Sequence, residues 1–585
     1  MAAPEDSTAP NQARAKPRGG RIRRHWPFLL FFAALVAYCA YLQLEFRGAL
    51  VQLFFVRIFF QIALAALVIA ILKNVVGVKT LGMFAPVIIA LALLFSGVVL
   101  GLSILGAVLG VVVLTRAAMV RERVQEAHRV AILVTMTGVT ITSLAIVGLE
   151  LGQHELFFGI LLPVLISSWM AERYVEQVRR VGWEAPSAAL GWTLAGVIIS
   201  FLVITQDPLV DFVLTNPLTW SVLVALHWFL GTRIRFRLGD RFRFSGIRRY
   251  NLGDGPTAGD FGDDVLTMPV RNREFVERYN APELMALLSK DRAKALLVPQ
   301  GIPMARTFLT LHLREDLGRF RTWLDGQQQF VIKPAGAHGG EGIILVWGRD
   351  GDVYETNEGR RDPAALEAHA RAILDGEYRG GTRDAVVVEE LLHPDGELKD
   401  LAAQGLPDLR IICFRGYPVM AMARIPTRAS GGKANLHLGA IAAGVRLSTG
   451  RIVHAVWRGF PYPVNPDTGA RLVGRQVPRW REILEIAAEA QSLSGLGFAG
   501  VDIAIDAQRG VVVMEVNRRP GLEIQNANAA GLLRRLRMVE SLGADGRSTE
   551  ERIAAIVQLD AANWGVPSSG PGAAVPAAGG PSPEG

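Results

Sequence analysis

The chain has 585 residues, of which 50% are hydrophobic and 20% are charged, and its formal net charge is +8. A soluble chain of this length usually carries about 25% charged residues, so the composition argues against a wholly soluble protein. Two cysteines, Cys39 and Cys413, are too few for a disulfide framework or a metal-thiolate site. The basic residues gather at 14–24 and 233–249 beside apolar segments, which favours membrane lipid as their partner and excludes nucleic acid from our expectations.

Composition changes along the chain predict five segments. We expect a disordered basic tail over 1–25, a membrane domain over 26–232 and a basic connector over 233–265. A folded domain over 266–545 follows, and 546–585 should form a C-terminal helix and a disordered tail rich in Pro, Gly and Ala.

Apolar runs in the first half approach the roughly 20 residues that a bilayer-spanning helix needs. About eight candidates occur, at 28–44, 50–72, 81–96, 98–115, 130–149, 156–170, 187–206 and 217–232. The third and fourth could together be one broken element. We expect the first to be a retained anchor, because no small-residue cleavage site follows it. Arg57 lies inside the second run, where an arginine either reaches out to the interface or has a functional role.

The connections between these runs alternate in charge. Basic connections occur at 73–79, 116–129 and 173–180, whereas Glu150 and Asp207 mark two of the other connections. Because cytoplasmic connections carry the Lys and Arg excess, eight spans place both termini and the folded domain on the cytoplasmic side. We therefore expect a multi-pass protein of the cell inner membrane.

The segment Val78–Pro86, at the start of the third run, resembles bacterial seven-helix membrane domains that are usually joined to an inactive, exported transglutaminase-like domain. In those relatives a first anchor helix precedes the exported domain. Here only about five residues, 45–49, follow the first run. The resemblance therefore implies the membrane domain without its exported partner domain, and it leaves an exported or membrane protein as an expected binding partner.

In the second half, the strand-like run 330–334 contains Lys333 near its end, and a turn with Gly339, Gly340 and Gly342 follows. Glycines let backbone N–H groups approach phosphate oxygens, and the lysine adds a point charge. Many hairpins share this pattern. A second apolar run, 385–392, contains Glu389 and Glu390, which either contact the adenosine part of a nucleotide or form a solvated strand end.

Two further strands, 500–505 and 511–517, predict a metal site. A period of two puts Glu515 and Asn517 on one face, with the apolar positions between them facing away, and Asp502 can join them across a hairpin. Two carboxylates and an amide oxygen are hard ligands that suit Mg²⁺, with Mn²⁺ as the alternative. An exposed strand face is the other interpretation.

Together these elements, in this order, resemble ATP-grasp proteins of the glutamate-ligase branch, which includes the ribosomal-protein-modifying ligases of the RimK type. The match spans about 270–535. The sugar-transfer-associated branch is closer still, because it shares the opening Arg271-Asn272-Arg273. The resemblance implies a helical membrane domain followed by an α/β (α+β) ATP-grasp domain that binds ATP.

The resemblance also assigns roles to residues. Lys290, Lys294, Lys333 and the glycine-rich turn would bind ATP, and Arg410 would approach the transferred phosphate. Asn435 and His437 belong to a segment similar to the family's Asn-Leu-His-x-Gly, where the histidine is either a general base or orders the loop. Three basic residues would receive an acidic substrate or else form a solvated loop. They are Arg424, Arg428 and Lys433.

We therefore expect a ligase that joins a carboxylate, such as glutamate or a peptide, to an amine through an acyl phosphate. One departure stands out: only 233–290 precedes the nucleotide lobe, where ATP-grasp enzymes carry a larger domain. Two alternatives stay open. The chain is instead an ATP-binding regulator or scaffold of a membrane complex, or a transporter driven by the second half.

Overall fold

The computed structural model describes residues 21–46, 54–119, 126–150, 170, 173–175, 177–178, 183–250, 262–287, 290–336, 340–379, 383–543 and 546–563. The chain divides into two compact units, Met1–Asp240 and Arg241–Gly585. The predicted span at 156–170 therefore lies almost wholly outside the described residues, as do most of the two predicted terminal tails.

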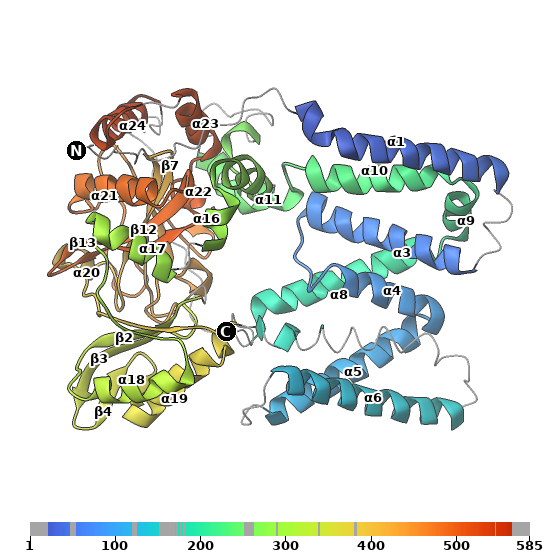
Figure 1. The fold of residues 1–585 in the computed structure, drawn as a ribbon, viewed down its shortest axis with the longest axis horizontal. Coiled ribbons are helices and arrows are strands. Elements are labelled where there is room, and N and C mark those ends of the chain that lie inside the picture. Colours follow the sequence, from blue (N-terminus) through green and yellow to red (C-terminus); the bar gives the residue numbers. More distant parts are fainter. Residues whose placement is uncertain are drawn as a thin grey trace, which may run out of the picture. The chain divides into compact units, whose positions relative to one another are not determined.

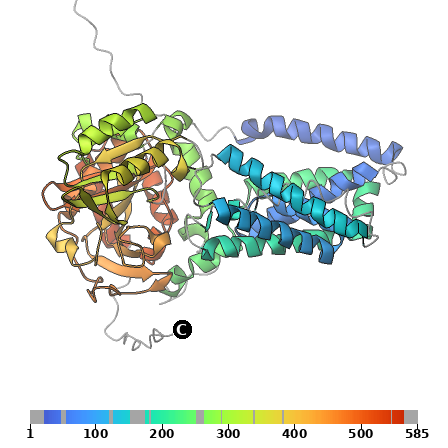
Figure 2. The same ribbon diagram turned by 90° about the horizontal axis from the view of Figure 1, so that it is seen from below.

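The first unit is helical, and its helices run side by side (Figures 1 and 2). In chain order they are α1 (Arg21–Glu45), α3 (Phe54–Ile71), the π-helical turn η1 (Leu72–Val76), α4 (Phe84–Ser96), α5 (Val98–Ala118), α6 (Glu126–Glu150), α8 (Glu184–Ile204), α9 (Asp207–Thr215) and α10 (Leu218–Thr232), with α11 (Leu238–Arg243) at the boundary of the unit. Helices α3, α4 and α8 enclose a buried apolar core that includes Ile69, Leu93 and Val197. A Cβ on Gly196 would lie 2.9 Å from the Ile69 Cδ1 atom, so the glycine permits the close approach of α8 to α3.

Three helices in the described part are long and apolar enough to cross a membrane: Trp26–Glu45, Phe54–Val76 and Pro186–Ile204. A fourth span is added if Asp207–Thr215 and Leu218–Thr232, which meet at 106°, count as one broken span. Shorter apolar helices cover the third, fourth and fifth predicted runs. In the described residues, apolar helices therefore occupy the predicted positions other than 156–170, whereas the count of eight stays a prediction.

Arg57 on α3 is held by α9. Its guanidinium forms ion pairs with Asp207 and, at 2.5 Å, with Asp211. Its side chain is 26% exposed. The arginine inside the second run thus pairs with carboxylates from the acidic connection about 150 residues further along the chain, a partner that neither interpretation of the sequence had named.

The second unit is built on two sheets, and the named strands of each sheet pair antiparallel. The six-stranded sheet has the order β1-β6-β2-β3-β4-β5. Its strands are β1 (Thr307–Leu311), β2 (Phe330–Pro334), β3 (Ile344–Asp350), β4 (Val353–Thr356), β5 (Gly359–Arg361) and β6 (Val386–Glu389). Helices α18 (Leu317–Leu324) and α19 (Pro363–Leu374) cover one face and share its apolar core (Figure 1).

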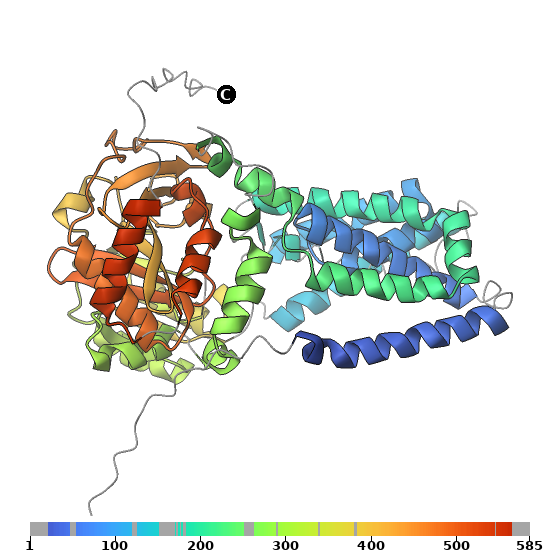
Figure 3. The ribbon, with the colours of Figure 1, turned by 90° about the horizontal axis from the view of Figure 1, so that it is seen from above.

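The seven-stranded sheet has the order β11-β10-β9-β8-β7-β12-β13. Its strands are β7 (Asp408–Phe414), β8 (Tyr417–Ile425), β9 (Ile441–Val445), β10 (Ile452–Trp457), β11 (Phe460–Pro461), β12 (Phe498–Asp506) and β13 (Gly510–Asn517). Helices α21 (Trp480–Leu493), α22 (Ile524–Ala527), α23 (Leu533–Ser541) and α24 (Thr549–Asn563) pack on this sheet (Figure 3). Strands β8 and β12 are almost entirely buried.

Short helices precede and connect the sheets. They are α12 (Ser245–Tyr250), α14 (Met268–Val270), the π-helical turn η4 (Arg271–Val276), α15 (Glu277–Tyr279), α16 (Pro282–Leu287), α17 (Lys290–Leu297), η5 (Val298–Gln300), η6 (Arg314–Asp316), η7 (Glu377–Arg379), α20 (Gly396–Lys399) and η8 (Leu436–Leu438). Arg271 is buried and donates through Nη1 to the Pro520 carbonyl at 2.8 Å. The opening of the domain is thereby tied to the turn that follows β13.

Candidate functional site

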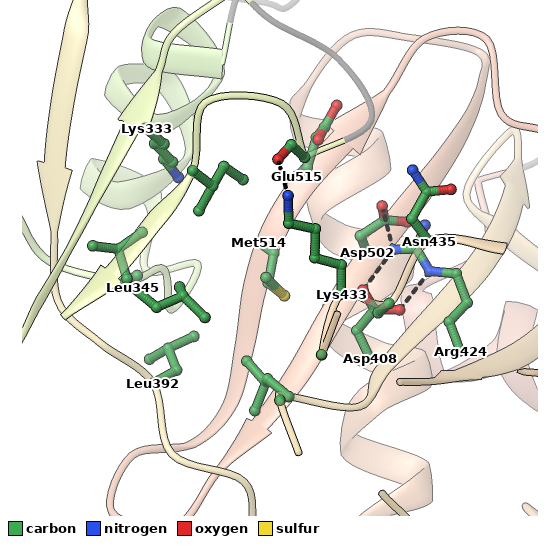
Figure 4. A pocket seen from close by; sticks show the side chains of 18 of the residues that line it. Lys333, Leu345, Leu392, Asp408, Arg424, Lys433, Asn435, Asp502, Met514 and Glu515 are labelled. Atoms are coloured by element: carbon green, nitrogen blue, oxygen red, sulfur yellow. Dashed lines mark hydrogen bonds and ion pairs between the residues drawn. The ribbon is translucent and has the colours of Figure 1, made fainter. Parts of the chain in front are cut away.

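A cavity of about 1600 Å³ lies within the second unit and is lined by residues of both sheets (Figure 4). The six-stranded sheet contributes Lys333 and Leu345, and the seven-stranded sheet contributes Asp408, Asp502 and Glu515. The sequence patterns that predicted a nucleotide turn and a metal strand therefore meet around one space.

Two lysines meet one carboxylate on the six-stranded side. Burial alternates along β2, so that Phe330 and Ile332 face the core while Lys333 faces the cavity. Lys333 forms an ion pair with Glu389 of the adjacent strand β6, and the Lys294 ammonium donates to the same carboxylate at 2.9 Å. Burial raises the pKa of Glu389, but the two ammonium groups outweigh it and hold that pKa below its ordinary value.

The neighbouring Glu390 has a different environment. Its carboxylate accepts the Arg306 backbone amide at 3.0 Å and the Arg509 guanidinium at 2.7 Å, at the partly exposed edge of the cavity. The two adjacent acidic residues therefore lie in different places: Glu389 is buried inside the cavity and Glu390 lies on its rim.

Two arginines and two aspartates form a buried cluster on the seven-stranded side. The Arg410 guanidinium donates to both Asp502 carboxylate oxygens, at 2.7 and 2.6 Å. Arg424 donates in the same way to Asp408, at 2.5 and 2.6 Å, and bridges to Asp502 at 2.8 Å. Neighbouring strands bring the four together, because Arg410 lies opposite Asp502 in the β7–β12 register and Asp408 lies opposite Arg424 in the β7–β8 register.

The cluster combines two basic and two acidic side chains, and the pKa values of both aspartates are shifted. Burial, together with the nearby Asp502, raises the pKa of Asp408 to about 6 in spite of Arg424. Burial also acts to raise the pKa of Asp502, but Arg410 and Arg424 outweigh it and lower that pKa. Such perturbed groups in a cavity mark a candidate functional site.

A β-bulge shapes the floor of the cavity. In the β12–β13 pair, Asp502 lies opposite Glu515 and Ile503 lies opposite Val513, so Met514 has no partner. Met514 is 40% exposed and lines the cavity, although a strict period of two would place it on the strand face opposite to Glu515. Together with Leu345 and Leu392 it forms an apolar wall that periodicity alone could not reveal (Figure 4).

The predicted metal ligands fit a hard cation by donor type. Glu515 and Asn517 both line the cavity, and they lie on β13, the strand that pairs with the Asp502 strand β12. Asn517 Oδ1 accepts the Arg519 amide at 3.0 Å and keeps a second lone pair, whereas both Asp502 oxygens are engaged by arginine. In the described part no three His, Cys, Asp or Glu side chains are grouped to hold a metal, so Asp502 would have to exchange an arginine contact to become a ligand.

Two loops approach each other over the cavity. The Lys433 ammonium donates to the Gly340 carbonyl at 3.1 Å, linking the glycine-rich turn to the loop after β8. Gly340 and Gly342 have φ of 81° and 69°, a region that favours glycine. The Ala337–Gly339 stretch, including Gly339, lies outside the described residues, as does the side chain of Lys290 on α17.

Asn435 and His437 lie at the cavity wall. The Asn435 side-chain oxygen accepts the His437 backbone amide at 3.0 Å and caps η8. Of the three basic residues expected to receive an acid, Arg424 and Lys433 line the cavity, whereas Arg428 is exposed and is absent from the cavity lining.

Comparison with known families agrees with the resemblance seen in the sequence. Residues 270–541 match the family described as sugar-transfer associated ATP-grasp. Residues 46–248 match the family described as seven transmembrane helices usually fused to an inactive transglutaminase. These matches, each over less than half of the chain, confirm the predicted fold class: a helical membrane domain followed by an ATP-grasp domain.

Several solved structures of ligases are similar to part of the chain. The ATP-grasp ligase PsnB, complexed with a minimal precursor, is 19% identical, with 45% of this chain and 62% of that chain covered and a TM-score of 0.25. The D-cycloserine synthetase DcsG is 14% identical, with 52% and 95% covered and a TM-score of 0.28. The VanG D-Ala:D-Ser ligase from Enterococcus faecalis is 16% identical, with 46% and 61% covered and a TM-score of 0.25. The chain thus spans about 62% of the length of PsnB, and no curated protein matches it.

Proposed function

We propose that the protein is a membrane-bound, ATP-dependent ligase that forms an amide bond between a carboxylate and an amine. The observation that carries the proposal is that one cavity is lined by Lys294 and Lys333 together with the Arg410–Asp502 cluster and Glu515. Cations on one wall suit a nucleoside triphosphate, and acidic and amide oxygens on the other suit its divalent ion.

In this proposal ATP lies along the cavity with its base against the apolar wall of Leu345, Leu392 and Met514. Lys294 and Lys333 bind the α- and β-phosphates, and Glu389 holds both ammonium groups toward them. Asp502, Glu515 and Asn517 would hold Mg²⁺, which neutralises charge on the phosphates when bound.

The chemistry proceeds in two balanced steps. A carboxylate oxygen of the substrate attacks the γ-phosphorus, which yields an acyl phosphate and ADP. The amine then attacks the acyl carbon, loses a proton and expels inorganic phosphate that carries the former carboxylate oxygen. Arg410 stabilises the charge of the transferring group, and Arg424 and Lys433 receive the acidic substrate. His437 either accepts the proton of the amine or orders its loop together with Asn435.

The test is ADP production by the purified full chain with MgATP. We expect ADP release to require both a carboxylate and an amine, and mass spectrometry of the mixture to detect an amide product. Glutamate and short acidic peptides are the first carboxylates to supply. Nucleotide binding with no turnover on any acid–amine pair would instead favour the regulator or scaffold.

We also propose that the protein lies in the cell inner membrane with both termini and the ATP-grasp domain in the cytoplasm. The alternating charge of the connections supports this orientation. A reporter fused after Arg249 should behave as cytoplasmic, and one inserted at 150–155 should behave as exported. A cytoplasmic signal at 150–155 would contradict the proposed arrangement.

A further inference from the structure

The motif that marks the membrane family forms a fixed loop after α3, and the ligase site makes no use of it. The loop covers 78–82. Its Thr80 hydroxyl donates to the Gly82 carbonyl at 2.6 Å, and the Leu81 amide donates to the Thr193 hydroxyl of α8 at 2.9 Å, in the core of the unit. The loop therefore keeps one position relative to α3 and α8.

A second segment is wedged against this loop. The chain turns at Gly77 with φ of 90°, and a Cβ there would lie 2.9 Å from the Arg237 Cβ atom. A Cβ on Gly239 would similarly approach the Val76 carbonyl oxygen to 3.1 Å. Two glycines thus let the Arg237 side chain cross the turn at the end of η1.

Two basic side chains at this point, Lys73 and Arg237, have no acidic side chain as an ion-pair partner among the described residues. The Lys73 ammonium reaches only the Gly82 carbonyl, at 3.5 Å. The Arg237 Nε atom is buried and has no hydrogen-bond partner, and the Asp240 carboxylate accepts the Arg237 backbone amide instead of the guanidinium. Arg173 and Arg237 both lie near enough to repel Lys73. In the part of the unit that the structure describes, neither Lys73 nor Arg237 forms an ion pair.

A buried guanidinium donor beside an unpaired ammonium is costly unless an anion satisfies both. Phosphate oxygens match these donors in charge and geometry. The loop continues into Met83 and Phe84, which are 39% and 71% exposed at the start of α4. Apolar side chains therefore follow directly on the basic turn, as expected where a headgroup and its acyl chains meet a protein.

We propose that Lys73 and Arg237, which lie beside the 78–82 loop, bind a phosphate group, supplied by a lipid headgroup or by a soluble phosphate compound. The site is independent of the ATP-grasp cavity and of the ligase proposal. It assigns a ligand to the basic turn beside the membrane-family motif.

The experiment uses the purified full chain in a neutral detergent, with phosphatidylglycerol binding followed by native mass spectrometry. We expect Lys73→Gln and Arg237→Gln each to weaken retention about fivefold, the effect of one basic charge at a headgroup. Lys73→Arg, which keeps the charge, should retain binding. Lys79→Gln is the matched control, because it removes the same charge from an exposed position of the same loop.

A second arm adds millimolar inorganic phosphate. Displacement of phosphatidylglycerol by phosphate would identify a site for free phosphate groups, and its failure to displace the lipid would identify a headgroup site. Size-exclusion profiles establish that each variant is folded, and Lys73→Gln alone decides the matter if Arg237→Gln does not fold. The proposal is overturned if all three Gln variants weaken binding alike, or if Lys73→Gln binds like the parent protein.

Discussion

Replacing Arg424 by Met should destabilise the protein in a manner that depends on pH. The Arg424 guanidinium makes three short hydrogen bonds to Asp408 and Asp502, and all three side chains are at most 13% exposed. Removing one partner from a buried ion pair costs about 3–5 kcal/mol. At about 2 °C per kcal/mol for a domain of this size, the melting temperature should fall by about 6–10 °C.

The sign of the pH dependence follows from Asp408. Burial raises its pKa to about 6 from an ordinary 3.8, so the folded state holds the proton more tightly than the unfolded state. The stability due to this proton is fully present below pH 3.8 and is lost as the pH rises through about 6, a loss of about 3 kcal/mol. Without Arg424 the carboxyl loses its attraction to a cation, and its pKa rises further. The deficit of the variant should therefore be larger at about pH 8 than at about pH 5.5.

The assay is scanning fluorimetry of the full chain in detergent at both pH values. Arg428→Met is the matched control, because Arg428 is exposed and should change stability by at most about 0.5 kcal/mol. Adding Asp408→Asn to Arg424→Met should restore much of the melting temperature, since it removes the unpaired charge. A deficit that is equal at both pH values, or no rescue by Asp408→Asn, would refute the electrostatic explanation.

Three further predictions concern the cavity. Met514→Ala should raise the KM for ATP severalfold while kcat stays within about twofold, because uniform binding is lost; an unchanged KM would remove Met514 from the base-binding wall. Glu515→Gln should raise the Mg²⁺ concentration needed for turnover, and at limiting Mg²⁺ it should raise the activation free energy by several kcal/mol. Unchanged turnover at limiting Mg²⁺ would exclude Glu515 as a ligand. Gly405→Ala would place a Cβ 1.9 Å from the Gly432 carbonyl oxygen and should therefore lower the melting temperature. Gly474→Ala is the control, because Gly474 has a similar φ but open space around it, and its shift should be smaller. Equal shifts in the two variants would contradict this packing.

Local patterns in the sequence predicted the elements that carry the site. The predicted strand 330–334 coincides with β2, and the predicted pair 500–505 and 511–517 lies within the β12–β13 hairpin. Short apolar runs that end in glycine or acidic residues predict such strands, because a few consecutive residues determine both the strand faces and the strand ends.

Features that depend on distant residues were not predictable in this way. Nothing in the sequence indicated that Arg410 forms hydrogen bonds with Asp502, 92 residues away. The bulge at Met514 depends on the β12–β13 register, which periodicity does not encode. In the membrane unit, the acidic connection beginning at Asp207 forms the helix α9, bent by 106° from α10.

The central claim is ligation through an acyl phosphate, and oxygen transfer tests it most directly. The full chain is incubated with MgATP, amines and acids whose carboxylates are labelled with ¹⁸O, and the released phosphate is analysed by mass spectrometry. Because phosphate leaves with the oxygen that attacked ATP, we predict one ¹⁸O atom in each phosphate formed along with amide. Unlabelled phosphate, released at the same rate without acid or amine, would contradict the account.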